Sequence, residues 1–167
     1  IGNLCLPRKT TALQGSNPGA KLTTGRYTGL GEESALLLAN ALLGNLTNPS
    51  MRWQSLQMRR AVLNTINAVQ DWTDEASTQF SQALNAGNFA TEASEFYLDL
   101  GVFGTAAMFR EGRLAPLGVF GGWIHRTLPI GTYCIAEDTE GRVDTLFRSL
   151  QMSVRAAYQQ WGEQIGP

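Results

Sequence analysis

The segment PIGTYCIAEDTEGRVDTLFR, residues 129–148, places two short runs of strand-forming residues on either side of an acidic turn. The runs 133–136 and 143–147 contain tyrosine, isoleucine, valine and phenylalanine, which favour strands. Gly141 closes the turn and supplies the positive φ that a short hairpin loop needs. The segment therefore predicts an antiparallel β-hairpin.

Three longer stretches before this hairpin have helical patterns. The first, residues 32–46, begins with Glu32 and Glu33, which the helix dipole favours, and is so apolar that we expect it to be enclosed on several sides. The second, 57–84, carries an apolar stripe at helical spacing and is followed by Gly87, which we expect to form a left-handed cap. The third spans 89–103.

Strands and a final short helix complete the predicted fold. We expect a strand at 105–110, a turn at Glu111 and Gly112, and a bent, glycine-rich strand within 114–128. Ser153 is typical of a helix cap before a helix at 154–161. The predicted fold class is α+β: three main N-terminal helices packed against a small antiparallel β-sheet, then a short C-terminal helix.

The start of the chain differs in composition from the rest. Residues 7–31 are rich in glycine, proline, serine and threonine, which predicts no helix or buried strand. We therefore divide the chain into an extended arm or loop, a helical part, an antiparallel β part and a C-terminal helix: 1–31, 32–104, 105–152 and 153–167, with 32–167 as one domain.

Composition excludes several classes of protein. The chain has 167 residues, 43% of them hydrophobic, and a formal net charge of -1, so it predicts a packed core and lacks the basic stripe of a nucleic-acid groove. Arg59 and Arg60 remain candidates for isolated phosphate contacts. No apolar run is long enough to span a membrane. Cys5 and Cys134 are predicted to be buried, reduced thiols.

Catalytic, metal and cofactor sites find little support. The single histidine, His125, has no neighbouring nucleophile motif, so we interpret it as a structural or surface residue. Four acidic residues gather at the hairpin and could hold a cation, although a solvated hairpin tip is the simpler interpretation: Glu137, Asp138, Glu140 and Asp144. We predict no catalytic residue, metal or cofactor. Two alternatives stay open: a small metal-assisted hydrolase using this hairpin and His125, or a binding module whose apolar helix receives a partner.

Four segments, in the same order, resemble the head-to-tail connecting (portal) proteins of short-tailed bacteriophages. The hairpin is similar to their P-x-G-x-Y-x-I-A-E-D-x-x-G-R-V-D-T-x-x-R segment. LCLPR at 4–8 resembles a proline-arginine element, and 38–53 resembles a helix-then-turn segment in which the usual tryptophan-phenylalanine pair is Trp53-Gln54 here. YLDLGVFGTAAMF at 97–109 resembles the element in which a helix hands over to a strand.

The resemblance implies a structural role rather than catalysis. It identifies the chain as the N-terminal wing part of a longer portal subunit, which forms a ring of identical subunits, typically twelve, at one capsid vertex. Double-stranded DNA passes through such a ring, and the implied partners are the terminase packaging motor, capsid or scaffold, and tail adaptors. The implied location is the virion, after synthesis in the host bacterial cytoplasm. The structural or interface candidates are Pro49, Trp53, Gly101, Gly104, Pro129, Gly131, Glu137, Asp138, Gly141, Arg142, Asp144 and Arg148.

Overall fold

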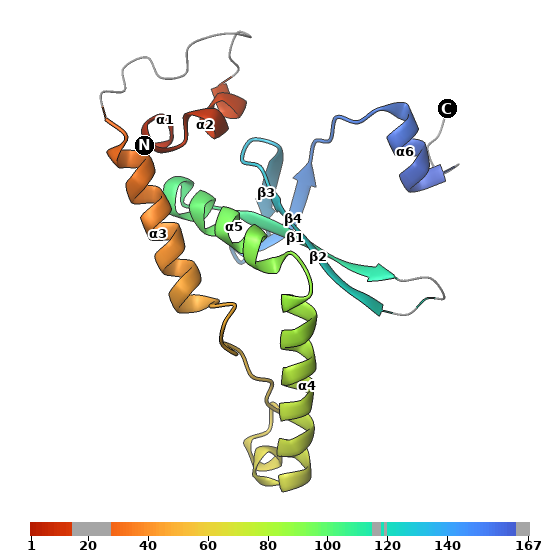
Figure 1. Ribbon diagram of the computed structural model, residues 1–167. Coiled ribbons are helices and arrows are strands. Elements are labelled where there is room, and N and C mark those ends of the chain that lie inside the picture. The colour runs from red at the N-terminus through yellow and green to blue at the C-terminus, as the bar shows by residue number, and fades with distance from the viewer. Residues whose placement is uncertain (15–27, 115–117, 119, 163–167) are drawn as a thin grey trace. The chain divides into compact units, whose positions relative to one another are not determined.

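The computed structural model describes residues 1–14, 28–114, 118 and 120–162, and it confirms the α+β class (Figure 1). The chain divides into two compact units, Ile1–Ile130 and Gly131–Pro167. This division differs from the single domain expected over 32–167, and each unit is described by itself below. The elements of the first unit are α1 Gly2–Cys5, α2 Pro7–Gln14, α3 Leu30–Leu46, the 3-10 helix η1 Ala61–Thr65, α4 Asn67–Asn85, α5 Phe89–Phe103, β1 Ala107–Leu114 and β2 Phe120–Leu128.

Helix α5 lies at the centre of the first unit, between α3 and the β1–β2 hairpin. On the α3 side, the buried contact consists of Ala35, Ala39 and Leu98. A Cβ on Gly101 would lie 3.1 Å from Leu38 Cδ2, so the missing side chain lets the two helices approach closely. Gly104 then ends α5 with φ 74°, a left-handed cap that turns the chain toward β1.

Strands β1 and β2 pair in antiparallel fashion from Ala107–Leu128 to Gly112–Trp123. The predicted turn at Glu111 and Gly112 is therefore wrong, because both residues pair within the ladder, and the register shifts only after Gly112. The expected bend falls partly on residues 115–117 and 119, which lie outside the described residues.

Two further helix predictions need correction. The arm prediction is wrong for 7–14, where α2 forms, since Pro7 is compatible with the first helical position; residues 15–27 lie outside the described part. The second long helix begins at Asn67, not at 57. Asn64 explains the late start: its side-chain amide accepts from Met58 N at 2.9 Å and donates to Met58 O at 3.1 Å, which closes a loop that includes the 3-10 helix η1 and does not continue α4.

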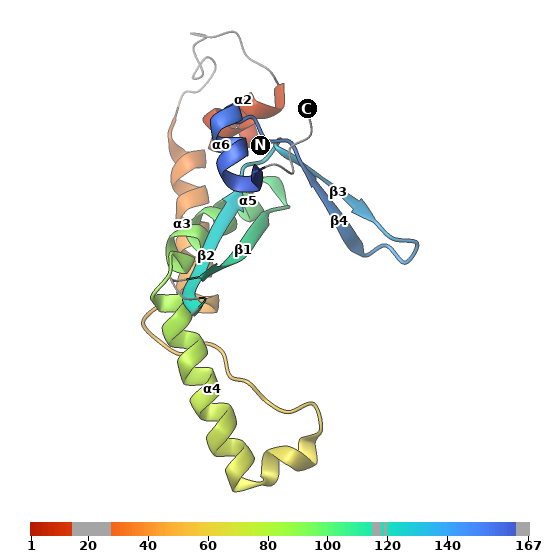
Figure 2. The same cartoon turned by 90° about the vertical axis from the view of Figure 1, so that its right-hand side faces the viewer.

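The chain before η1 runs beside α4, as both views show (Figure 2). Leu56 N donates to the buried Ser77 Oγ at 2.8 Å, and Gln54 Nε2 donates to Ser81 Oγ at 2.8 Å. The two serine hydroxyls that accept these bonds lie on the side of α4 that faces the loop. The loop is therefore anchored along the helix by hydrogen bonds.

The second unit contains the predicted hairpin and helix, β3 Tyr133–Glu137, β4 Val143–Arg148 and α6 Val154–Trp161. Cys134 pairs with Phe147 and Ile135 with Leu146, and Gly141 adopts φ 76° in the turn. Ser153 Oγ accepts from Ala156 N at 3.3 Å and caps α6. The predicted hairpin, the positive φ of Gly141 and the helix capped by Ser153 are thus confirmed. Cys134 is exposed, however, so the expectation of a buried thiol is wrong there.

Gly87 does not form the predicted left-handed cap, because it is not among the glycines with positive φ. Its role is close approach: a Cβ at Gly87 would lie 2.6 Å from the backbone oxygen of Trp123, and this brings the end of α4 against β2.

Gly87→Ala should lower the free energy of unfolding by about 1–3 kcal/mol, since the clash is with backbone and cannot be relieved by a rotamer. Gly44→Ala is the matched control. It lies inside α3 with nothing within 4 Å of its Cβ position, so it should raise stability by about 0.5–1 kcal/mol. Urea unfolding measures both, and equal effects of the two substitutions would contradict the close approach.

Candidate assembly interface

The described chain buries few large apolar side chains. The apolar residues that are buried are Ala35, Ala39, Leu84, Ala93, Leu98, Leu128 and Ile130. All of them belong to the first unit, so the described residues of the second unit include no buried apolar side chain. Since a two-stranded hairpin is at best marginally stable in water, the second unit needs a further surface to pack against.

Helix α3 leaves four leucines exposed on several sides of its axis, which we call the α3 leucines: Leu36, Leu37, Leu38 and Leu46. Leu37 is 73% exposed, and the other three are each about half exposed. The prediction that this helix is enclosed on several sides is therefore not met by the described residues, because α5 and α1 cover only the side of Ala35 and Ala39.

The second unit carries two more exposed apolar surfaces. Ile135 and Leu146 are cross-strand partners and both remain nearly half exposed, while Phe147 on the opposite face is 66% exposed. On α6, the exposed residues Val154, Tyr158 and Trp161 follow each other at i, i+4 and i+7, and so form one apolar helix face.

The acidic hairpin is organised as a turn. Asp138 Oδ1 accepts from Glu140 N at 2.8 Å and from Arg142 N at 2.9 Å, so this carboxylate is engaged in holding the loop. Arg142 forms an exposed ion pair with Glu140 at 3.1 Å. Among the described residues, no group of three or more His, Cys, Asp or Glu side chains is arranged to hold a metal ion.

The other candidate residues take structural positions. Pro49 follows the end of α3 in a turn in which Ser50 N donates to Asn48 Oδ1 at 2.9 Å. Gly131 adopts φ 89° between β2 and β3, two residues after Pro129. Asp144 and Arg148 both lie in β4, but the β3–β4 register shifts at Asp144, so the alternation that would place both on one face is interrupted there.

Trp53 and His125 belong to an aromatic cluster of the first unit. The Trp53 and Phe89 rings stack at 5.8 Å between centroids, and the Phe89 and His125 rings meet edge to face at 5.2 Å. His125 is only 3% exposed, which agrees with its interpretation as a structural residue. Burial, and then the positive charge of Arg110, lower the pKa of His125 below its ordinary value of 6.5.

The first turn of α5 binds the outer edge of β2. Asn88 Nδ2 donates to His125 O at 2.7 Å, and Asn88 Oδ1 accepts from His125 N at 2.8 Å. One turn later, Glu92 Oε2 accepts from Thr127 N at 2.6 Å. These side chains occupy hydrogen-bonding positions that a third strand would otherwise take, so this stretch of the edge is closed to strand addition.

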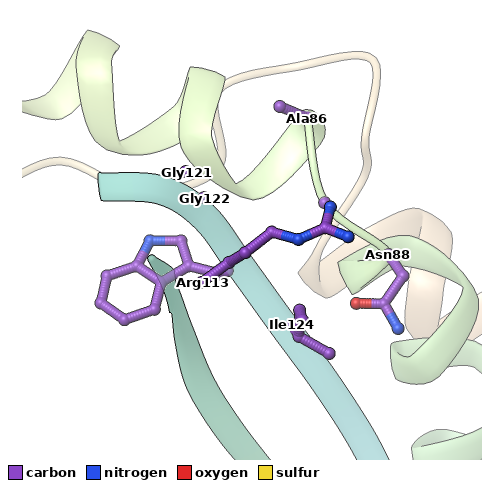
Figure 3. A pocket seen from close by; sticks show the side chains of 8 residues that line it. Ala86, Asn88, Arg113, Gly121, Gly122 and Ile124 are labelled. Atoms are coloured by element: carbon purple, nitrogen blue, oxygen red, sulfur yellow. The ribbon is translucent and has the colours of Figure 1, made fainter. Parts of the chain in front are cut away.

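A small pocket of about 200 Å³ lies where α4, α5 and the two strands meet (Figure 3). Gly121 and Gly122 form part of its wall, and the Arg113 side chain lies across it with the guanidinium directed toward the segment that joins α4 to α5 (Figure 3). This pocket places a cation beside the start of α5.

Lys9 fastens α2 to α5 through two carboxylates. Its Nζ lies 2.7 Å from Glu95 Oε2 and 2.6 Å from Asp99 Oδ1, and the Asp99 side chain is buried. Burial raises the pKa of Asp99, and the bond from Lys9 offsets this rise only in part. Burial also lowers the pKa of Lys9, but the hydrogen bonds to the two carboxylates outweigh it and leave that pKa above 10.5.

Comparison with known proteins identifies the family. The sequence model described as bacteriophage head to tail connecting protein matches residues 1–167, the whole chain. The chain belongs to this family. It is 27% identical over 165 residues to the probable portal protein of Bordetella phage BPP-1, a match that covers 98% of this chain and 29% of that protein.

A second relative agrees. The portal protein of Salmonella phage epsilon15 is 27% identical over 135 residues, which covers 79% of this chain and 23% of that protein. The connector chain thus spans less than a third of the length of either curated relative. In the part that the structure describes, no helix of the connector chain combines the length and apolarity needed to cross a membrane.

Sequence reasoning missed the polar contacts that order the first unit of the connector chain. Asn88 and Glu92, and likewise Glu95 and Asp99, are four residues apart on α5, and this spacing was the available signal that each pair shares a helix face. Nothing in the sequence indicated their partners, which lie 35 to 90 residues away.

Lys9→Met should lower the free energy of unfolding by about 1–3 kcal/mol near neutral pH, because it leaves the Asp99 carboxylate buried without its cation. Adding Asp99→Asn should recover part of this loss. Arg52→Met is the matched control: its pair with Asp74 is exposed, so the loss should stay below about 1 kcal/mol. Equal losses of unfolding free energy in Lys9→Met and Arg52→Met, measured by urea unfolding, would contradict the stabilising role of the Lys9–Asp99 pair.

His125 should make the first unit less stable in mild acid. Because its folded pKa is depressed, its contribution is present above pH 6.5 and is lost as the pH falls through that value toward the folded pKa. Between about pH 7.5 and about pH 5.5, the wild type should lose more unfolding free energy than His125→Gln, by about 1.4 kcal/mol per unit of pKa depression. Identical pH slopes in the two proteins would refute this role for His125.

Proposed function

We propose that this chain is the N-terminal wing part of a portal subunit, the head-to-tail connector of a bacteriophage, and that identical subunits form a closed ring, typically of twelve. The match of the family over all 167 residues carries the proposal. Both relatives support it, since one is a portal protein and the other a probable portal protein.

The exposed apolar surfaces are what an assembled wing requires. The α3 leucines, the β3–β4 hairpin and the apolar face of α6 each expose large apolar side chains, and grouped exposed apolar side chains commonly mark interaction sites. In a ring, each of these surfaces is available to a neighbouring copy or to another part of the same subunit. The second unit has the greatest need of such a partner, because none of its described apolar side chains is buried.

In this function the work is mechanical and interfacial, and no residue of the chain is catalytic. His125 is buried and neutral, and Asp138 is engaged in its own turn, so neither supports the hydrolase alternative. The alternative of a binding module, whose apolar helix receives a partner, becomes part of this proposal, because the α3 leucines are among the proposed assembly contacts. Arg59 and Arg60 are exposed, but a net charge of -1 does not favour strong DNA binding.

The remaining partners follow from the same proposal. Double-stranded DNA passes through the central channel of the ring during packaging and ejection. The terminase packaging motor, the capsid or scaffold and the tail adaptors dock on the ring at one capsid vertex of the virion. The subunit is made in the cytoplasm of the host bacterium.

Light scattering and negative-stain microscopy test the ring directly. The protein at its natural length should give one high mass and closed rings with a central channel, while the 167-residue chain alone should give a lower mass, because it supplies only part of each interface. A natural-length protein that stays monomeric at all concentrations would refute the proposed function.

A further inference from the structure

An open aromatic pocket of about 410 Å³ lies in the first unit. Its walls come from the loop after α3, from α4, from the start of α5 and from both strands: Trp53, Phe80, Leu84, Phe89, Met108 and His125. The rings of Trp53, Phe89 and His125 contact one another, so this wall is already ordered. Its volume falls in the range of sites that hold a small ligand or a large side chain.

The pocket carries one positive charge at its edge. Arg110 lines it, and the Arg110 guanidinium lies 4.6 Å from the centre of the Trp123 ring. Since the pKa of His125 is depressed, the imidazole is neutral near pH 7 and does not add a second charge. The pocket therefore suits an apolar, aromatic group with acidic neighbours.

Helix α4 exposes such a group on another part of the same unit. Trp72 is 62% exposed, although tryptophan is the side chain with the most apolar area to bury. It is flanked on α4 by Asp71 and Glu75, both exposed. Trp72 lies eight residues before Phe80, which places it a little over two helical turns from the pocket and on a different side of α4.

We propose that Trp72 of one subunit inserts into the aromatic pocket of the next subunit in the ring. This inference rests on the proposed function, because a ring requires two different and complementary patches on each copy. The charges match: Asp71 and Glu75 beside Trp72 would meet Arg110 at the pocket edge. Interface hot spots are also enriched in tryptophan and lie in well-packed, desolvated pockets.

Cysteine cross-linking between copies tests the contact. In the natural-length protein, with Cys5 and Cys134 replaced by serine, Glu75→Cys, which keeps Trp72 in place, and Met108→Cys are introduced singly into two differently tagged copies. These are mixed before assembly and treated with a short bismaleimide. The mixture should give a cross-linked dimer that carries both tags, and the double variant should give a ladder of larger species. Thr78→Cys with Met108→Cys is the matched control, because Thr78 is exposed on another side of α4.

Trp72→Ala supplies a second readout. It should raise the concentration needed for half-assembly at least about ten-fold, as expected for a hot-spot tryptophan, while Thr78→Ala should leave it unchanged. Normal rings without the 75–108 cross-link would overturn this inference and leave the proposed function intact. Failure of the unmodified protein to assemble would overturn both.

Discussion

Helix α5 is held on three sides by interactions of different kinds, and the order of the first unit depends on this arrangement. Small side chains bring it against α3, with Gly101 under Leu38 and alanines at the buried contact. Its middle receives Lys9 from α2 at Glu95 and Asp99. Its first turn binds the edge of β2 through Asn88 and Glu92.

This arrangement explains why a chain with so few large buried side chains is still well ordered in its first unit. Hydrogen bonds and a buried ion pair fix the relative positions of helix and strands, and they do so with geometry that an apolar contact alone would not specify. The larger apolar side chains are consequently left at the surface. In the proposed ring, neighbouring subunits would cover that surface.

The parts of the fold that were predictable from sequence are those fixed by local rules. The 129–148 hairpin follows from strand-forming runs around Gly141, helix α5 from its apolar spacing and the Gly104 stop, and α6 from the Ser153 cap. Interactions between distant residues could not be read in this way. The late start of α4 depends on Asn64 binding Met58, and the role of Gly87 depends on Trp123 in a strand that follows much later. Helix α2 was hidden because a glycine-rich stretch follows it directly.

The central claim is that the exposed apolar surfaces of this chain are buried when the connector assembles. Hydroxyl-radical footprinting of the natural-length protein, in assembled and dissociated forms, measures the solvent exposure of individual side chains. The account predicts that Leu37, Phe147 and Val154 react in the dissociated form and are protected in the assembled form. Equal reactivity of these side chains in both forms would contradict it.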